Sequence, residues 1–179
     1  ATTPLPFRRM ETLPAEEMQI DYGQGAWVEE AGSKTRRRPW VFRAVLSYSR
    51  KAYSEVVWRQ DTETFLRCIE NAFRYFGGVV AKVVPDNLKA AVLHADWFDP
   101  DLNPKLAEFA KHYGTVIMPT KPAMPRHKGK VEKGVNYVQD NALKARTFGS
   151  LAEQNIFLSN WERNTADKRI RGTLRQQVA

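Results

Sequence analysis

The sequence predicts an α/β domain with a five-stranded mixed sheet, three antiparallel strands followed by two parallel ones, and helices on both faces. Two observations support this fold class. Residues 18–59 contain three segments rich in β-branched and aromatic residues, separated by turns, as in an antiparallel meander. Residues 61–161 then alternate between apolar residues at helical spacing and short apolar runs, which is typical of strands connected by helices.

The chain of 179 residues is long enough for one domain with a sizeable core. We expect this domain to cover residues 18–165. An extended lead-in is expected at residues 1–17, and a basic tail or linker at residues 166–179. Because the chain begins Ala-Thr-Thr without an initiator Met, we also expect it to be excised from something longer.

Composition excludes several classes of protein. Hydrophobic residues make up 42% and aromatic residues 11% of the chain, as in a folded protein rather than a disordered one. Cys68 is the one cysteine, so an internal disulfide and a multi-cysteine zinc site are excluded. No apolar run could span a bilayer, and no signal-peptide pattern opens the chain. We therefore expect a cytoplasmic protein without a membrane partner, with Cys68 as a small core residue.

The net charge is +8 and the isoelectric point is near 9.7. Such a balance suits a polyanionic partner, either nucleic acid or an anionic membrane surface. Many basic proteins bind neither, so the position of the charge along the chain carries more information than its total.

The first three predicted strands follow one another closely. Met18, Ile20 and Tyr22 alternate with polar residues at the period of a strand, and this strand is expected to run through Trp27 and Val28. The next two strands are expected at residues 40–48 and 52–59, where β-branched and aromatic residues are frequent.

Capping residues predict two helices in the middle of the chain. Asp61 is a good N-cap before apolar residues at helical spacing, and Gly77 provides the C-terminal stop. Asn103 as N-cap and Pro104 at the first helical position open another helix, which Gly114 closes.

The remaining elements follow from apolar runs and one further capping motif. Ser150 and Glu153 form a capping box for the last helix. The other expectations are strands at 79–84 and 115–118, a proline-rich loop at 119–129, and a long helix at 130–146 with a valine stripe.

Asp21 is an unusual residue for the strand that contains it. Aspartate is depleted in strands, because its short polar side chain competes for backbone hydrogen bonds and gains little from packing. Such a residue either faces water at a sheet edge or is kept for its charge. Two other acidic residues, Asp86 and Glu132, could converge on it, and three carboxylates brought together repel one another unless they hold a divalent metal.

Each of the other two carboxylates also has an ordinary interpretation. Asp86 follows the fourth strand, where ligand sites cluster in α/β sheets, but a cap for the next helix is the better explanation when Asp86 is considered alone. Glu132 lies in the most basic stretch of the chain, where an i, i+4 pair with Lys128 on a solvated face is sufficient explanation. Taken singly, both favour the structural interpretation.

Three motifs in order change this interpretation. They are Gln-Ile-Asp-Tyr-Gly at 19–23, Pro-Asp-Asn-Leu-Lys at 85–89, and Pro-Arg-His-Lys-Gly-Lys-Val-Glu at 125–132. With them the chain resembles the catalytic domain of DDE-type transposases and integrases over about residues 7–165. The Phe-Arg-Arg-Met-Glu stretch at 7–11 makes it most similar to the IstA transposases of bacterial insertion sequences.

The resemblance implies an RNase H-like fold and a metal-dependent polynucleotidyl transferase that cuts transposon ends and joins 3′-hydroxyls to target DNA. It implies two Mg²⁺ or Mn²⁺ ions, with Asp21 bridging both and Asp86 and Glu132 each completing one. It further implies a homo-oligomer in the full transposase, an IstB-type ATPase partner, and use at the bacterial nucleoid. The helix-turn-helix region expected of a full transposase is absent from residues 1–179.

Basic and polar residues around Glu132 are candidates for sequence-independent DNA contacts, and an arginine run in a predicted turn is a weaker one. The candidates are Arg126, His127, Lys128, Lys130, Lys133, Asn136, Arg36 and Arg37. Two rival functions remain open: an RNase H-like nuclease that hydrolyses without joining, and a DNA-binding or assembly module that is catalytically inactive.

Overall fold

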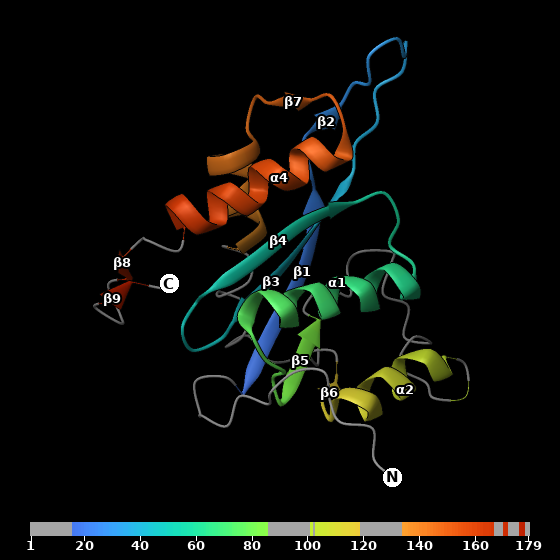
Figure 1. Cartoon of the computed structure of the whole chain (residues 1–179), viewed down its shortest axis with the longest axis vertical. Helices are drawn as coiled ribbons and strands as arrows, with labels where there is room; N and C mark the ends of the chain where they lie inside the picture. Colours follow the sequence, from blue (N-terminus) through green and yellow to red (C-terminus); the bar gives the residue numbers. More distant parts are fainter. Residues whose placement is uncertain are drawn as a thin grey trace.

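The computed structural model describes residues 16–85, 101, 103–118, 134–166, 170–171 and 176–177. A twisted central sheet carries helices on both faces (Figure 1). Within the described residues no helix is long and apolar enough to cross a membrane.

The central sheet has five strands in the order β4-β3-β1-β5-β6. Its strands are β1 (Glu17–Gln24), β3 (Trp40–Leu46), β4 (Ala52–Val57), β5 (Lys82–Pro85) and β6 (Val116–Ile117). β1, β3 and β4 pair antiparallel, whereas β5 pairs parallel with β1, and β6 pairs parallel with β5. The predicted mixed sheet of three antiparallel and two parallel strands is confirmed.

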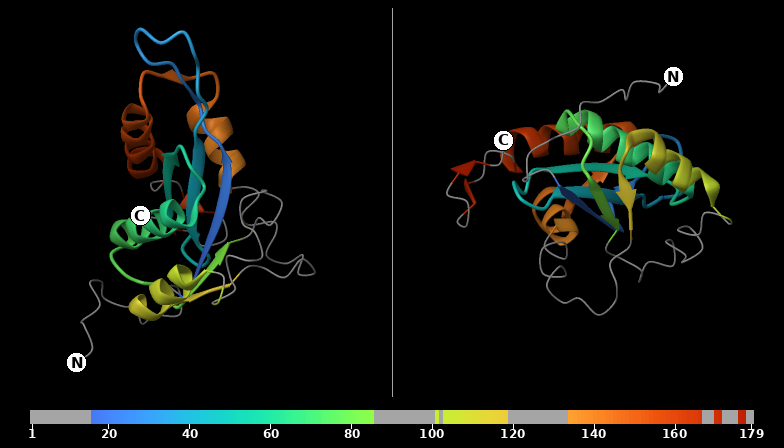
Figure 2. Two further views of the ribbon diagram at one scale, coloured as in Figure 1. Left: turned by 90° about the vertical axis from the view of Figure 1, so that its right-hand side faces the viewer. Right: turned by 90° about the horizontal axis from the view of Figure 1, so that it is seen from below.

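Helices cover both faces of this sheet, as predicted. α1 (Thr62–Phe76) and α2 (Pro104–Tyr113) lie on one face, and the helical residues 134–143 lie on the other (Figure 2). α4 (Leu151–Trp161) runs along β4 (Figure 1). There the Asn155 side-chain amide accepts from the Val56 N–H at 2.7 Å and donates to the Val56 carbonyl at 3.1 Å.

The alternation of β1 divides the apolar residues into two clusters. Met18, Ile20 and Tyr22 belong to a core under α1 and α2, together with Phe65 and Phe73. The opposite face packs against residues 134–143 and α4 in a second, smaller cluster. That cluster contains Ala26, Val41, Val56, Val138, Ala142, Leu143, Phe148, Leu158 and Trp161.

α1 begins and ends where its capping residues predict. The Asp61 side chain accepts from the Thr64 N–H at 2.8 Å, and Gly77 adopts the left-handed conformation at φ 78°. The Asp61 pKa lies below its ordinary value of 3.8, because the hydrogen bonds from Thr64 favour the carboxylate. Cys68 is fully buried in α1, which confirms it as a core residue.

The first predicted strand is too long. β1 ends at Gln24, and residues 27–28 form a separate strand, β2 (Trp27–Val28), paired parallel with β7 (Thr147–Phe148). The Gly25 N–H still donates to the Pro39 carbonyl in the register of β1 with β3. The chain leaves the sheet at Ala26, because both backbone groups of Ala26 bond to the buried Gln154 amide instead of to β3. The side chain of a distant helix therefore ends the strand.

Other boundaries also move. The strands expected at 40–48, 52–59, 79–84 and 115–118 are observed at 40–46, 52–57, 82–85 and 116–117. The helix expected to end at 146 is α-helical over residues 134–138 and then π-helical over Gln139–Leu143. It stops there because Lys144 turns extended and Ala145 takes a left-handed φ of 59°, which leads into β7.

The remaining capping and tail predictions have mixed outcomes. Pro104 opens α2 as expected, but the Asn103 side chain donates to the Thr62 hydroxyl rather than capping the helix. Ser150 caps α4 by accepting from the Glu153 N–H, while the Glu153 carboxylate accepts from Gly149 rather than from Ser150. In the expected tail, β8 (Ile170–Arg171) pairs with β9 (Gln176–Gln177).

Candidate active site

Asp21 lies in the middle of β1 on the face away from α1. Its neighbours Ile20 and Tyr22 are buried in the core under α1, so the alternation of the strand directs the Asp21 side chain to the opposite face. One carboxylate oxygen of Asp21 accepts from the Tyr22 N–H at 2.8 Å, and the residue is half-buried. The predicted placement of an acidic residue within the first strand is confirmed.

The parallel pairing of β1 and β5 brings the second motif to the same place. Ile20 is the register partner of Pro85, so the residues that precede Asp21 and Asp86 lie side by side. Asp86 itself is outside the described residues.

The helical residues 134–143 cover this part of the sheet at very close range. A Cβ atom added to Gly23 would lie 2.1 Å from Cγ1 of Val135, so only glycine fits there. The Gln139 amide donates to the Gln24 carbonyl at 2.9 Å. Gly134 lies over β3, where an added Cβ would be 3.4 Å from Nε of Arg43.

The third motif ends two residues before the described part of this helix. Glu132 precedes Gly134 by two residues and lies outside the described part of the chain. The basic candidates Arg126, His127, Lys128, Lys130 and Lys133 also lie outside it. Asn136 is described and exposed, two residues after Gly134.

Arg43 is a charged residue of the site that the sequence analysis missed. It is the register partner of Asp21 on β3 and is only 3% exposed. Its guanidinium makes a buried ion pair with Glu162 and donates to the Ser54 hydroxyl at 2.8 Å. Its signal in the sequence is the same as that of Asp21, namely a charge inside a segment with the composition of a strand, Trp-Val-Phe-Arg-Ala-Val-Leu.

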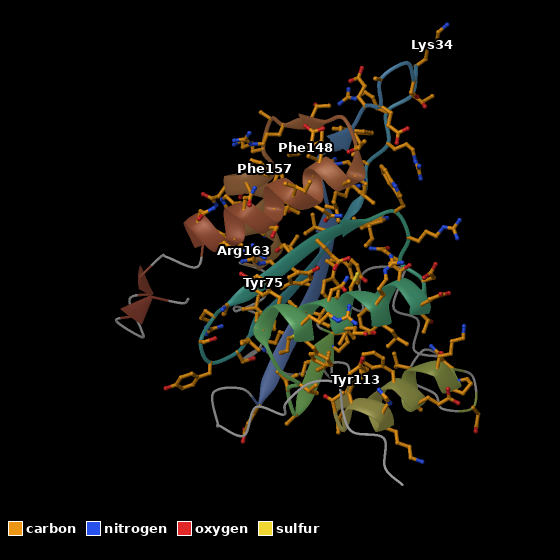
Figure 3. All side chains as sticks on the ribbon, viewed as in Figure 1. Lys34, Tyr75, Tyr113, Phe148, Phe157 and Arg163 are labelled. Atoms are coloured by element: carbon orange, nitrogen blue, oxygen red, sulfur yellow. The ribbon has the colours of Figure 1, made fainter. Side chains whose placement is uncertain are left out.

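Arg36 and Arg37 lie in the exposed segment between β2 and β3, outside the strand that contains Asp21. Figure 3 shows Lys34 at the tip of this segment. The guanidinium of Arg36 lies 4.7 Å from the ring centre of Trp27, and that of Arg37 lies 4.0 Å from the ring centre of Trp58. Within the described residues neither guanidinium has a carboxylate partner.

The other titratable groups near β1 are unsuited to nucleophilic chemistry. Burial, followed by the charge of Glu55, raises the pKa of the Cys68 thiol far above its ordinary value. Burial likewise raises the pKa of the Tyr22 hydroxyl. In the described part of the chain no three His, Cys, Asp or Glu residues group as metal ligands would. Among these described titratable groups, Asp21 is the candidate for chemistry at this face.

Comparison with known proteins decides the family. Residues 12–125 match the integrase core domain, which is more than half of the chain. The chain belongs to the integrase core domain family. This confirms the resemblance to DDE-type transposases and integrases.

Curated relatives of this integrase core chain are insertion-sequence transposases. It is 36% identical over 162 residues to the transposase for insertion sequence element IS21 of Pseudomonas aeruginosa, covering 90% of the chain and 41% of that protein. It is 35% identical over 162 residues to the transposase for insertion sequence element IS640 of Shigella sonnei, covering 90% of the chain and 50% of that protein. The chain thus spans only about two fifths to one half of these relatives.

Solved structures with the same fold are retroviral integrase cores. The catalytic core domain of bovine immunodeficiency virus (BIV) integrase matches 92% of the chain and 91% of its own length, at a TM-score of 0.54 and 14% identity. The HTLV-2 integrase catalytic core domain in complex with magnesium (trimeric form) matches 93% and 95%, at a TM-score of 0.53 and 15% identity. The RNase H-like fold is therefore confirmed.

Proposed function

We propose that this integrase core is the catalytic domain of a DNA transposase, a metal-dependent polynucleotidyl transferase. It cuts DNA at transposon ends and joins the freed 3′-hydroxyls to target DNA. Family membership and the insertion-sequence transposases among the relatives support this proposal.

The observation that supports the proposal is that the end of β5 and the helical residues 134–143 both lie next to the part of β1 that contains Asp21. Asp21 faces the helical residues 134–143, Pro85 lies beside Ile20, and Gly134 lies on Arg43, the register partner of Asp21. If the β1–β5 register continues by one residue, Asp86 lies beside Asp21 at the strand spacing of about 4.8 Å. Glu132 lies two residues before Gly134 in the sequence.

The residues present suit divalent magnesium or manganese rather than zinc. Asp21 offers carboxylate oxygen at a half-buried position, and oxygen donors select hard cations. Asp21, Asp86 and Glu132 would together hold these ions, two to a site. When bound, such ions activate the attacking water or 3′-hydroxyl and stabilise the leaving oxygen. The chain itself supplies the rigid strand that holds Asp21 in place.

DNA would be held by two groups of basic and polar residues. Arg126, His127, Lys128, Lys130, Lys133 and Asn136 flank Glu132 along the chain. Arg36 and Arg37 provide a second, remote contact, because stacking on an indole holds a guanidinium in place while its N–H groups still point outward. Contacts of this kind bind phosphates without reading sequence.

The whole protein is proposed to act as a homo-oligomer on transposon ends and target DNA, at the nucleoid in the bacterial cytoplasm, with an IstB-type ATPase as partner. Assembly of relatives supports the first part: one HTLV-2 core structure is trimeric, and a simian T-cell lymphotropic virus intasome has the same fold at a TM-score of 0.54. The ATPase partner rests on the similarity to the IS21 transposase.

The test is strand transfer by the full-length transposase carrying Asp21→Asn, with Glu108→Gln, an exposed acid of α2 on the other face of the sheet, as matched control. We expect Asp21→Asn to keep DNA affinity and lose both cutting and joining, and Glu108→Gln to behave as wild type. Cutting without joining in the wild-type protein would favour the nuclease. Normal joining by Asp21→Asn would refute the proposed site.

A further inference from the structure

A row of three polar side chains crosses the sheet beside the proposed metal site. Asp21 on β1 pairs with Arg43 on β3, and Arg43 pairs with Ser54 on β4. Directly paired residues of antiparallel strands point to the same face, with Cβ atoms about 4.5–5.5 Å apart. A buried cation is therefore the nearest cross-strand neighbour of the carboxylate that the proposed function assigns to metal.

Glu162 ends this row. It follows α4 in the π-helical segment Glu162–Ala166 and is 1% exposed. The same carboxylate oxygen accepts from the Arg43 guanidinium and, at 2.7 Å, from the Ser54 hydroxyl. Two donors thus fix Glu162 at the end of Arg43 that is remote from β1.

The surroundings keep the Arg43 guanidinium in this position. The rings of Tyr137 and Trp161 each lie 6.0 Å from its central carbon, and Gly134 covers its Nε. Nε is buried and has no hydrogen-bond partner among the described residues. The Nη1 group of Arg43 therefore donates to Glu162 and Ser54. Its Nε–H lies beneath Gly134.

We propose that Glu162 is a positioning residue that holds and neutralises Arg43, so that Arg43 does not compete with a divalent cation for the Asp21 carboxylate. This inference rests on the proposed function. If Glu162 lost its charge, Arg43 would be a buried cation without a counterion, and the carboxylate of its register partner is the nearest replacement. An Arg43–Asp21 ion pair would then compete with the metal, and the cation would also repel it.

The test compares two variants of the full-length transposase that separate charge from packing. Glu162→Gln removes the counterion and keeps the cation. Arg43→Met/Glu162→Leu removes both charges at similar volume, a replacement that buried ion pairs often tolerate without loss of stability. Glu153→Gln, at an exposed acid of α4, is the control, because it changes charge on the same helix outside the buried row.

Two measurements are made on each variant: the Mn²⁺ concentration that gives half-maximal DNA cleavage, and the rise in melting temperature caused by Mn²⁺. For Glu162→Gln we expect the half-maximal Mn²⁺ concentration to rise at least about tenfold, because the Arg43 charge, no longer neutralised, lies a few ångströms from the ion. Cleavage should recover at high Mn²⁺. For the double variant we expect wild-type or stronger metal binding. Glu153→Gln should match wild type.

Equal weakening of metal binding in Glu162→Gln and in the double variant would overturn the proposal, because the pair would then act only through packing. A wild-type metal response in Glu162→Gln would also overturn it. Asp21→Asn, measured in parallel, separates this failure from a failure of the proposed function. If Asp21→Asn keeps the metal response, the assigned site itself is wrong, and the inference about Glu162 fails with it.

Discussion

Close contact at Gly23 sets how far the covering helix stands from Asp21, which is two residues away on the same face of β1. An added Cβ at Gly23 would meet Val135 at 2.1 Å, which no ordinary contact permits, and Gln139 at 2.9 Å. The absence of a side chain at one strand position therefore allows the helix to lie directly on the strand.

We expect Gly23→Ala to lower the free energy of unfolding by about 1–3 kcal/mol, the usual cost of overpacking a filled site. Urea denaturation measures this loss. Val135→Ala removes the clashing methyl groups, so the double variant Gly23→Ala/Val135→Ala should lose less stability than the sum of the two single variants. Strict additivity would show that the helix does not rest on Gly23.

The Asp61 cap gives a pH dependence of known sign. Because the pKa of Asp61 is lowered in the folded state, its contribution to stability is present above the unfolded pKa and is lost as pH falls through the folded pKa. We expect Asp61→Asn, which keeps a side-chain oxygen to cap Thr64, to flatten the fall in melting temperature below about pH 4. An unchanged acid profile in Asp61→Asn would contradict this assignment.

At the scale of elements, α4 is attached to the sheet through amide side chains that imitate strand pairing. Gln154 bonds both backbone groups of Ala26, and the next residue, Asn155, bonds both backbone groups of Val56. β4 is the first strand of the sheet, so Asn155 satisfies backbone groups that an edge strand otherwise leaves open.

Replacement of Gln154 by Leu should lower the free energy of unfolding by at least about 1–3 kcal/mol, because it leaves the buried N–H and carbonyl of Ala26 without partners. Ile156→Ser on the same helix is the control: Ile156 is 64% exposed, so its loss should change stability little. Thermal denaturation compares the two variants. Equal effects would mean that the Gln154 hydrogen bonds contribute nothing to stability.

The elements predicted correctly are those whose signals are local. Asp61 and Gly77 mark the two ends of α1. The alternation along β1 predicts which of its side chains face the core, namely Met18, Ile20 and Tyr22. Both signals act within a few residues. The predicted end of β1 is wrong because its cause, Gln154, lies 128 residues from Ala26.

The residues of the candidate site likewise divide into those recognisable from local sequence and those that depend on distant contacts. Asp21 is recognisable as an acidic residue within a strand, and its position is confirmed, whereas the positions of Asp86 and Glu132 stay predictions. The partner of Arg43 could not be inferred, because Glu162 lies 119 residues away and joins the site only through the packing of α4. Arg43 itself carries a signal, since a charge within an apolar strand needs a counterion.

At the scale of the whole molecule, two regions are proposed to meet DNA: the face around Asp21 and the exposed segment between β2 and β3. Arg37→Ala should weaken DNA binding and reduce the slope of log affinity against log salt by about 0.9, the change expected when one phosphate is no longer neutralised. Arg74→Ala is the control, because Arg74 pairs with Glu70 on the exposed side of α1. Fluorescence anisotropy over a salt series measures both variants, and identical slopes would exclude Arg37 from the DNA interface.

The central claim is that Asp21, Asp86 and Glu132 together hold the catalytic metal ions. The most direct measurement is anomalous diffraction from crystals of the full-length transposase bound to transposon-end DNA and Mn²⁺. We expect manganese peaks within about 2.0–2.6 Å of carboxylate oxygens of Asp21, with Asp86 and Glu132 completing the coordination. Manganese bound elsewhere, with the Asp21 carboxylate paired to Arg43 instead, would contradict it.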